Sequence, residues 1–259
     1  MRFFTYETQL PKDVGFSFFG SVHLAWLAGI LAFTAIVALW FSQRPAYRQR
    51  RISWAVAWLL CAMIVVEKVV LALTGHLNVY SLPFHLCELA PLLYLLFAWR
   101  HWDWLGQVIY TLCFPGAAAA LLFPDWSAYP QWNFMNINSF LVHGLLILFP
   151  ILQLVEHTIR PRLGALWKVW LFLAVLVPPM WLFNRAFGTN YLFLNAASPN
   201  SPLTWILGFT GPAWYLLGYA LLGLAVMVVM LLPWVGRKEY CKSDSLVVRL
   251  SLSIQILPD

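Results

Sequence analysis

Hydrophobic residues in this chain gather into seven long runs separated by polar connections. A helix needs roughly 20 mostly apolar residues to cross a hydrocarbon core about 30 Å thick. The runs therefore predict an all-α, polytopic membrane protein, built as a bundle of seven transmembrane helices. The predicted spans are Phe18–Phe41, Ile52–Leu73, Leu82–Trp99, Trp104–Phe123, Ile137–Val155, Leu163–Phe183 and Ala213–Val235. Around this domain (18–235) we expect an extracytoplasmic segment (1–17) and a cytoplasmic tail (236–259), in which VVRLSLSIQIL alternates like a strand.

Basic residues predict the orientation of the bundle. They occur in the first, third and fifth connections and after the last span, whereas the second and fourth connections contain no Lys or Arg. Positive residues favour the cytoplasmic side, so we expect the N-terminus outside and the C-terminus in the cytoplasm of a multi-pass cell-membrane protein. Aromatic residues after the fourth span are typical of the outer interface: Trp126, Tyr129 and Trp132.

Composition supports a membrane protein and argues against other classes. The chain is 62% hydrophobic and 10% charged, which is not the balance of a soluble domain. The basic residues behind its net charge of +6 lie in the short connections between the apolar runs. They do not form a continuous basic surface, so nucleic acid is not an expected partner. The four cysteines show no paired spacing, which argues against a disulfide framework or a CxxC metal site. No cleavable signal peptide is apparent, and no cofactor is expected.

Six polar side chains share one depth in the predicted membrane. Counted along antiparallel spans at 1.5 Å per residue, they lie about 7–10 Å below the outer boundary. Charged and titratable groups are costly in hydrocarbon, so such a cluster indicates a functional site. We expect these residues to line one pocket open to the outer leaflet: His23, Glu67, Lys68, His85, Cys87 and His143.

Helix geometry limits which of these groups can pair. At about 100° per residue, His85 and Glu88 share a helix face while Cys87 points away from both. A base for Cys87 must therefore come from another helix, with His143 the first candidate and His23 the second. The alternatives are that Cys87 is a small hydrophobic residue and that His143 is an interhelical hydrogen-bonding group.

Glu67 and Lys68 are adjacent in one predicted span. Neighbouring residues on a helix do not face each other, so the two need not form an ion pair. We expect Glu67 to find a partner on another helix and Lys68 to extend toward the outer surface. Either residue could bind a substrate headgroup, and Glu88 is a further candidate substrate-binding residue.

The connection after the sixth span is long and rich in Asn, Tyr and Trp. Such composition favours a structured lid over the pocket rather than a plain interfacial loop. Its candidate substrate-binding residues are Asn184, Asn190, Tyr191 and Tyr215.

Several motifs together resemble a known family. LPFHLCE at 82–88, His143, FGTNY at 187–191 and GPAWY at 211–215 are similar to the YwaF-type integral membrane family, which includes animal transmembrane protein 164. The resemblance runs from about Phe16 to Pro233. It implies a lipid acyltransferase that moves acyl chains between phospholipids with a cysteine and a histidine, which match Cys87 and His143.

Three functional hypotheses follow. In the first, Cys87 attacks a phospholipid ester with His143 as general base, and a lysophospholipid then collects the acyl group; His85, Asn190 or backbone amides would stabilise the oxyanion. In the second, His23, His85 and His143 hold zinc in a seven-span lipid or amide hydrolase. In the third, the protein is a transporter or a small-molecule receptor, although polar groups near one side argue against a transporter.

Overall fold

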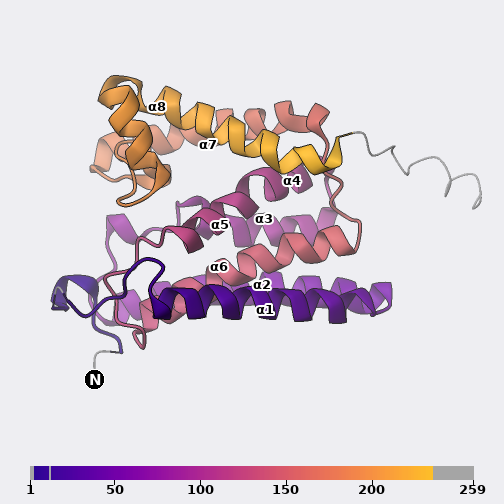
Figure 1. The fold of residues 1–259 in the computed structure, drawn as a ribbon, viewed down its shortest axis with the longest axis horizontal. Helices are drawn as coiled ribbons and strands as arrows, with labels where there is room; N and C mark the ends of the chain where they lie inside the picture. The colour runs from indigo at the N-terminus through magenta and orange to yellow at the C-terminus, as the bar shows by residue number, and fades with distance from the viewer. Residues whose placement is uncertain (1–2, 12, 236–259) are drawn as a thin grey trace, which may run out of the picture.

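The computed structural model describes residues 3–11 and 13–235, and in these ranges every regular element is helical. The predicted tail, 236–259, lies outside the described residues. The principal helices run along the long axis of the molecule (Figure 1). They are α1 (Ser21–Ser42), α2 (Ala46–Leu73), α3 (Leu86–Arg100), α4 (Asp103–Val108), α5 (Phe114–Leu122), α6 (Phe134–Val155), α7 (Leu166–Phe187) and α8 (Pro202–Leu231).

Six helices in the described part of the chain are long and apolar enough to cross a membrane. One of them is the continuous stretch 103–122, in which the π-helical turn Ile109–Cys113 joins α4 to α5. These six match six of the predicted spans. The remaining predicted span, Leu82–Trp99, contains α3, which has only 15 residues. The all-helical membrane fold is therefore confirmed, while the count of seven spans and the orientation stay predictions.

The helix α6 lies at the centre of the bundle. It packs against α1, α2 and α5, and also touches α3. Its neighbours approach closely because Gly144 has no side chain: a Cβ there would lie 3.3 Å from Ile30 of α1. The core around α6 is apolar and includes Tyr94 and Phe149, whose rings stack with centroids 4.4 Å apart.

The helices α7 and α8 form the other side of the molecule (Figure 1). They contact the rest mainly through α4 and the π-helical turn. In α8, Gly211 (φ 69°, ψ 170°) interrupts the helical backbone. The chain folds back at this kink and brings the two parts of α8 close together: a Cβ on Gly218 would lie 2.6 Å from the Ile206 side chain. The sequence predicted the part of α8 after this kink and missed the helical part before it.

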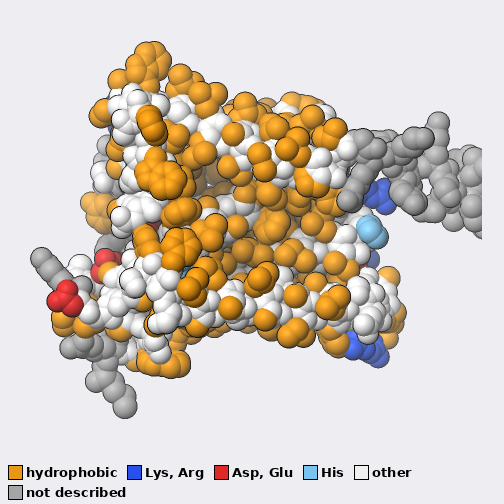
Figure 2. All heavy atoms as spheres, viewed as in Figure 1, with side chains coloured by type: hydrophobic (Ala, Val, Ile, Leu, Met, Phe, Trp, Pro, Cys, Tyr) orange, Lys and Arg blue, Asp and Glu red, His pale blue; other side chains and the backbone are white. Residues whose placement is uncertain are grey.

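The surface fits a membrane environment. Hydrophobic side chains cover most of the face shown in Figure 2. On that face, Lys and Arg side chains lie at the end where α1 finishes, and Asp and Glu side chains at the opposite end. Many large apolar residues are well exposed, among them Leu31, Leu73 and Phe209 at 72%, 82% and 90%. Lipid contact explains an exposed apolar surface of this kind.

Candidate active site

The short helix α3 places its first turn inside the predicted membrane. At 1.5 Å per residue, its 15 residues extend only about 22 Å, less than a full span of about 30 Å. Leu82 and His85 precede it in extended backbone, whose N–H groups need partners in an apolar surrounding. The Leu82 N–H donates to the Tyr191 hydroxyl (2.9 Å) and the His85 N–H donates to Glu88 Oε2 (3.2 Å). Cys87 therefore lies in the first turn of a helix whose start is held by side chains.

An ionic network joins three helices beside this turn. Lys68 Nζ of α2 donates to Glu67 Oε1 (2.7 Å) and to Glu88 Oε1 of α3. Asn138 Nδ2 of α6 donates to Glu67 Oε2 (2.8 Å). The three charged side chains are only 13–18% exposed. If both carboxylates are ionised, the network of two carboxylates and one ammonium has one net negative charge.

This network corrects one expectation and extends another. Lys68 does not extend to the surface; its long side chain turns back and pairs with its neighbour Glu67 as well as with Glu88. Adjacent helix positions can meet when one side chain is long and a third group, here the Glu88 carboxylate, draws it to one side. Glu67 does find its partner on another helix, and that partner is Asn138.

His143 has the hydrogen bonding expected of a general base. Its Nδ1 lies 2.8 Å from the Ser139 carbonyl oxygen. A carbonyl oxygen only accepts, so Nδ1 carries the proton, and the Nε2 lone pair of the neutral ring meets no donor among the described residues. The ring is 8% exposed and stacks on Trp126, with centroids 4.8 Å apart and 20° between planes.

Cys87 is half-buried in the same region. It packs against the core cluster that contains Val142, the residue before His143. The helices α3 and α6 contact each other, yet no hydrogen bond joins the Cys87 thiol to a histidine in the described part of the chain. Catalytic hydrogen bonds are often formed only when substrate binds. The pairing of Cys87 with His143 therefore stays a prediction.

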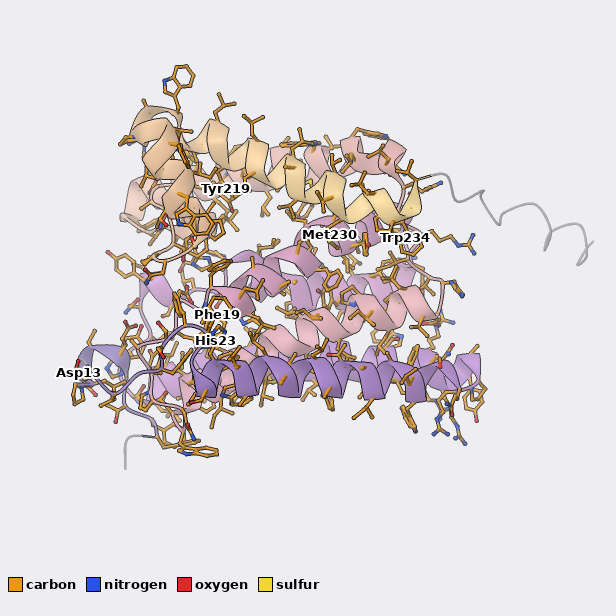
Figure 3. The ribbon with its side chains drawn as sticks, in the orientation of Figure 1. Asp13, Phe19, His23, Tyr219, Met230 and Trp234 are labelled. Carbon is orange, nitrogen blue, oxygen red and sulfur yellow. The ribbon has the colours of Figure 1, made fainter. Side chains whose placement is uncertain are left out.

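His23 is a structural group. It is fully buried, its Nδ1 accepts from the Phe19 N–H (2.9 Å), and its Nε2 lies 2.7 Å from the Leu121 carbonyl oxygen. Both ring nitrogens thus contact backbone: Nδ1 holds the segment just before α1, and Nε2 joins α1 to the end of α5. Figure 3 shows His23 and Phe19 side by side at the start of α1.

The three histidines of the zinc hypothesis do not converge. His85 packs instead against Tyr191 and Phe193, with ring centroids 5.1 and 5.2 Å away. Among the residues that the structure describes, no three His, Cys, Asp or Glu side chains are grouped so that they could hold a metal ion. The arrangement therefore gives the zinc hypothesis no support.

The loop after α7 is folded against the segment before α3. Asn184 closes it by donating from Nδ2 to the Tyr191 carbonyl and by accepting from the Tyr191 N–H (both 2.9 Å). Asn190 Oδ1 accepts from the Asn195 and Ala196 N–H groups, and the Tyr215 hydroxyl donates to the Phe193 carbonyl. These side chains hold the loop; their predicted contact with substrate stays a prediction.

Tyr191 connects this loop to α3. Burial raises the pKa of its phenol, so the hydroxyl keeps its proton and donates to the Val79 carbonyl (2.7 Å) while accepting from Leu82. Phe193, which touches His85, has a left-handed backbone (φ 54°) that is unusual for a bulky residue. The loop therefore holds one wall of the site in a defined and strained conformation.

Comparison with known proteins decides the family. A model of the TMEM164 family matches residues 18–231, which is most of the chain. The chain belongs to the TMEM164 family. The family resemblance predicted from the sequence is thereby confirmed. No curated protein and no solved structure matches this member of the TMEM164 family.

Sequence reasoning missed two site residues of this TMEM164 family protein. Trp126 was assigned to the outer interface but is only 6% exposed and covers His143. Asn138 was not singled out, although an amide in an apolar span is a signal for an interhelical contact.

A hollow of about 780 Å³ lies at the end of the bundle where the chain begins. It lies between the N-terminal segment, the first residues of α1 and the loop that contains Trp132, and none of the predicted site residues lines it. The predicted site residues therefore lie outside this hollow, and the site around Cys87 and His143 stays a prediction.

Proposed function

We propose that this TMEM164 family protein is a membrane phospholipid acyltransferase of the cell membrane. In this proposal, Cys87 carries the acyl group as a thioester and His143 moves the protons. One observation supports it above the others: His143 is buried and its Nδ1 is held by the Ser139 carbonyl, so that Nε2 has no hydrogen-bond partner among the described residues. A free, oriented imidazole nitrogen near a thiol is what nucleophilic acyl transfer requires.

In the first half-reaction, the Cys87 sulfur attacks the ester carbonyl carbon of a donor phospholipid. His143 Nε2 takes the thiol proton as the S–C bond forms. The tetrahedral intermediate then collapses, the ester C–O bond breaks, and His143 returns the proton to the departing lysophospholipid oxygen. The products are an acyl-enzyme thioester and a lysophospholipid.

In the second half-reaction, the hydroxyl of an acceptor lysophospholipid attacks the thioester carbonyl. His143 Nε2 takes the hydroxyl proton, the C–S bond breaks, and His143 returns the proton to sulfur. One acyl chain has moved between two lipids, and the protein ends as it began.

The charges around Cys87 bear on when the proton leaves. Glu88 follows Cys87 in the first turn of α3, and its carboxylate would repel a resting thiolate. The start of α3 has the opposite effect, because helix N-termini attract negative charge. We therefore expect proton transfer to His143 to accompany the attack rather than to precede it.

The test is lipid turnover by purified protein in vesicles that hold an isotope-labelled donor phospholipid and a lysophospholipid. We expect Cys87→Ser and His143→Ala to lose most turnover, since an alcohol is far harder to ionise than a thiol. The matched control is Cys61→Ser, because Cys61 is also a half-buried free cysteine of a membrane helix. An acyl adduct on Cys87, seen by intact mass, would support the thioester, whereas full turnover by Cys87→Ala would refute the proposal.

A further inference from the structure

Trp126 has a buried hydrogen-bond donor without an acceptor. The residue lies in the connection between α5 and α6 and is 6% exposed. Its Nε1–H meets no acceptor among the described residues. An indole N–H can only donate, and a buried donor left unpaired lowers stability. An unpaired donor of this kind calls for an explanation, and a ligand that supplies the acceptor is one.

Two rings of α6 fix the indole in place. It lies flat on His143, with centroids 4.8 Å apart and planes 20° apart. It also meets the Phe140 ring edge-on, at 5.3 Å and 86°. Donors that are held rigidly where charge develops are effective in catalysis, because they need no reorganisation during the reaction.

We propose that Trp126 is a catalytic residue: its Nε1–H donates a hydrogen bond to the carbonyl oxygen of the lipid ester. This inference rests on the acyl transfer proposed above. As the Cys87 sulfur bonds to the carbonyl carbon, the C=O π electrons move to the oxygen, and the indole N–H stabilises the resulting oxyanion. When the intermediate collapses, the electrons return to the carbonyl as the ester C–O bond breaks. Trp126 keeps its proton throughout.

The groups that the sequence suggested for this role are placed differently. Asn190 donates from Nδ2 to the Ala196 carbonyl (2.9 Å) and accepts two backbone N–H groups, so its amide already serves the loop. His85 packs on the aromatic rings of Tyr191 and Phe193. Trp126 instead combines an unused donor with direct contact to the proposed base.

The test removes the N–H and keeps the ring. Benzothienylalanine at position 126 replaces the indole N–H by sulfur with nearly the same shape, and Trp126→Phe is the simpler variant. We expect lipid turnover to fall about 10²-fold in both, with the KM for donor lipid nearly unchanged, since removal of one oxyanion donor typically costs 10²–10³ in kcat. The matched control is Trp132→Phe in the same connection, where the side chain is 73% exposed.

Two inhibitors separate catalysis from positioning. A trifluoromethyl ketone analogue of the donor lipid forms a tetrahedral oxyanion on Cys87, whereas iodoacetamide alkylates Cys87 without one. We expect the benzothienylalanine variant to bind the ketone about 10²-fold more weakly and to react with iodoacetamide at the normal rate. Equal loss in both assays would show that Trp126 only positions His143, and normal ketone binding would also overturn the inference. Retained turnover by Cys87→Ala would instead refute the acyl transfer itself.

Discussion

Replacement of Lys68 by Met should destabilise the bundle strongly. The ammonium group pairs with both the Glu67 and the Glu88 carboxylates, which come from two helices and are 15% and 13% exposed. Without it, the two carboxylates keep only the Asn138 amide and the His85 N–H as partners among the residues that the structure describes. Removal of one member of a buried ion pair costs about 3–5 kcal/mol, and the partial exposure of these groups favours the lower end, about 3 kcal/mol. For a chain of this size, that loss corresponds to roughly 6–12 °C in Tm.

The measurement is thermal unfolding of the detergent-purified protein, followed by loss of the monodisperse species. The control is the triple variant Glu67→Gln/Lys68→Met/Glu88→Gln, which has no unpaired charge and in which glutamine oxygens can still accept from Asn138 and from the His85 N–H. We expect it to recover most of the lost Tm. A Lys68→Met protein as stable as the native one, or a triple variant less stable than Lys68→Met alone, would refute this account of the network.

Two further predictions concern the backbone. Gly211 adopts φ 69° and ψ 170°, a region almost restricted to glycine, so Gly211→Ala should cost about 1–3 kcal/mol although no atom blocks the new Cβ. Gly208→Ala, in the helical part with open space around it, is the control and should not destabilise in the same Tm assay. Tyr191→Phe removes the hydroxyl that joins Val79 and Leu82, which should cost about 1–3 kcal/mol and speed hydrogen exchange at the Leu82 amide. Unchanged exchange at Leu82 would contradict the role of this hydroxyl.

The helices were predictable because hydropathy and length report membrane spans directly. The boundaries of the helices and the irregularities within them were less predictable. The π-helical turn at Ile109–Cys113 lies in an unbroken apolar run, where an extra residue per turn changes no pattern. The helical stretch from Pro202 to the kink at Gly211 was hidden because it follows a polar loop and ends at a Gly-Pro pair.

The shared depth of the candidate site residues stays a prediction, and few of their contacts could be predicted from the sequence. Antiparallel counting places groups at one level, but it does not reveal which side chains bend toward one another. Lys68 illustrates this limit, because its pairing depends on Glu88 of another helix. His23 illustrates a second limit, because its Nε2 contacts the carbonyl oxygen of Leu121, which lies at the end of a helix distant in the sequence. Trp126 was misassigned because tryptophans are common at membrane interfaces, and the local sequence does not distinguish an interfacial tryptophan from one that is buried in the protein.

The salt bridge between α2 and α3 also bears on biogenesis. A 15-residue helix with a carboxylate in its first turn is a poor substrate for independent membrane insertion, because acidic residues oppose entry into the bilayer. Lys68 pairs with Glu67 on its own helix, and the Glu88 carboxylate gains this ammonium as a partner only once α2 and α3 are together. The translocon should therefore release the two helices into lipid as one hairpin, so that the step which inserts α3 also brings Cys87 into position.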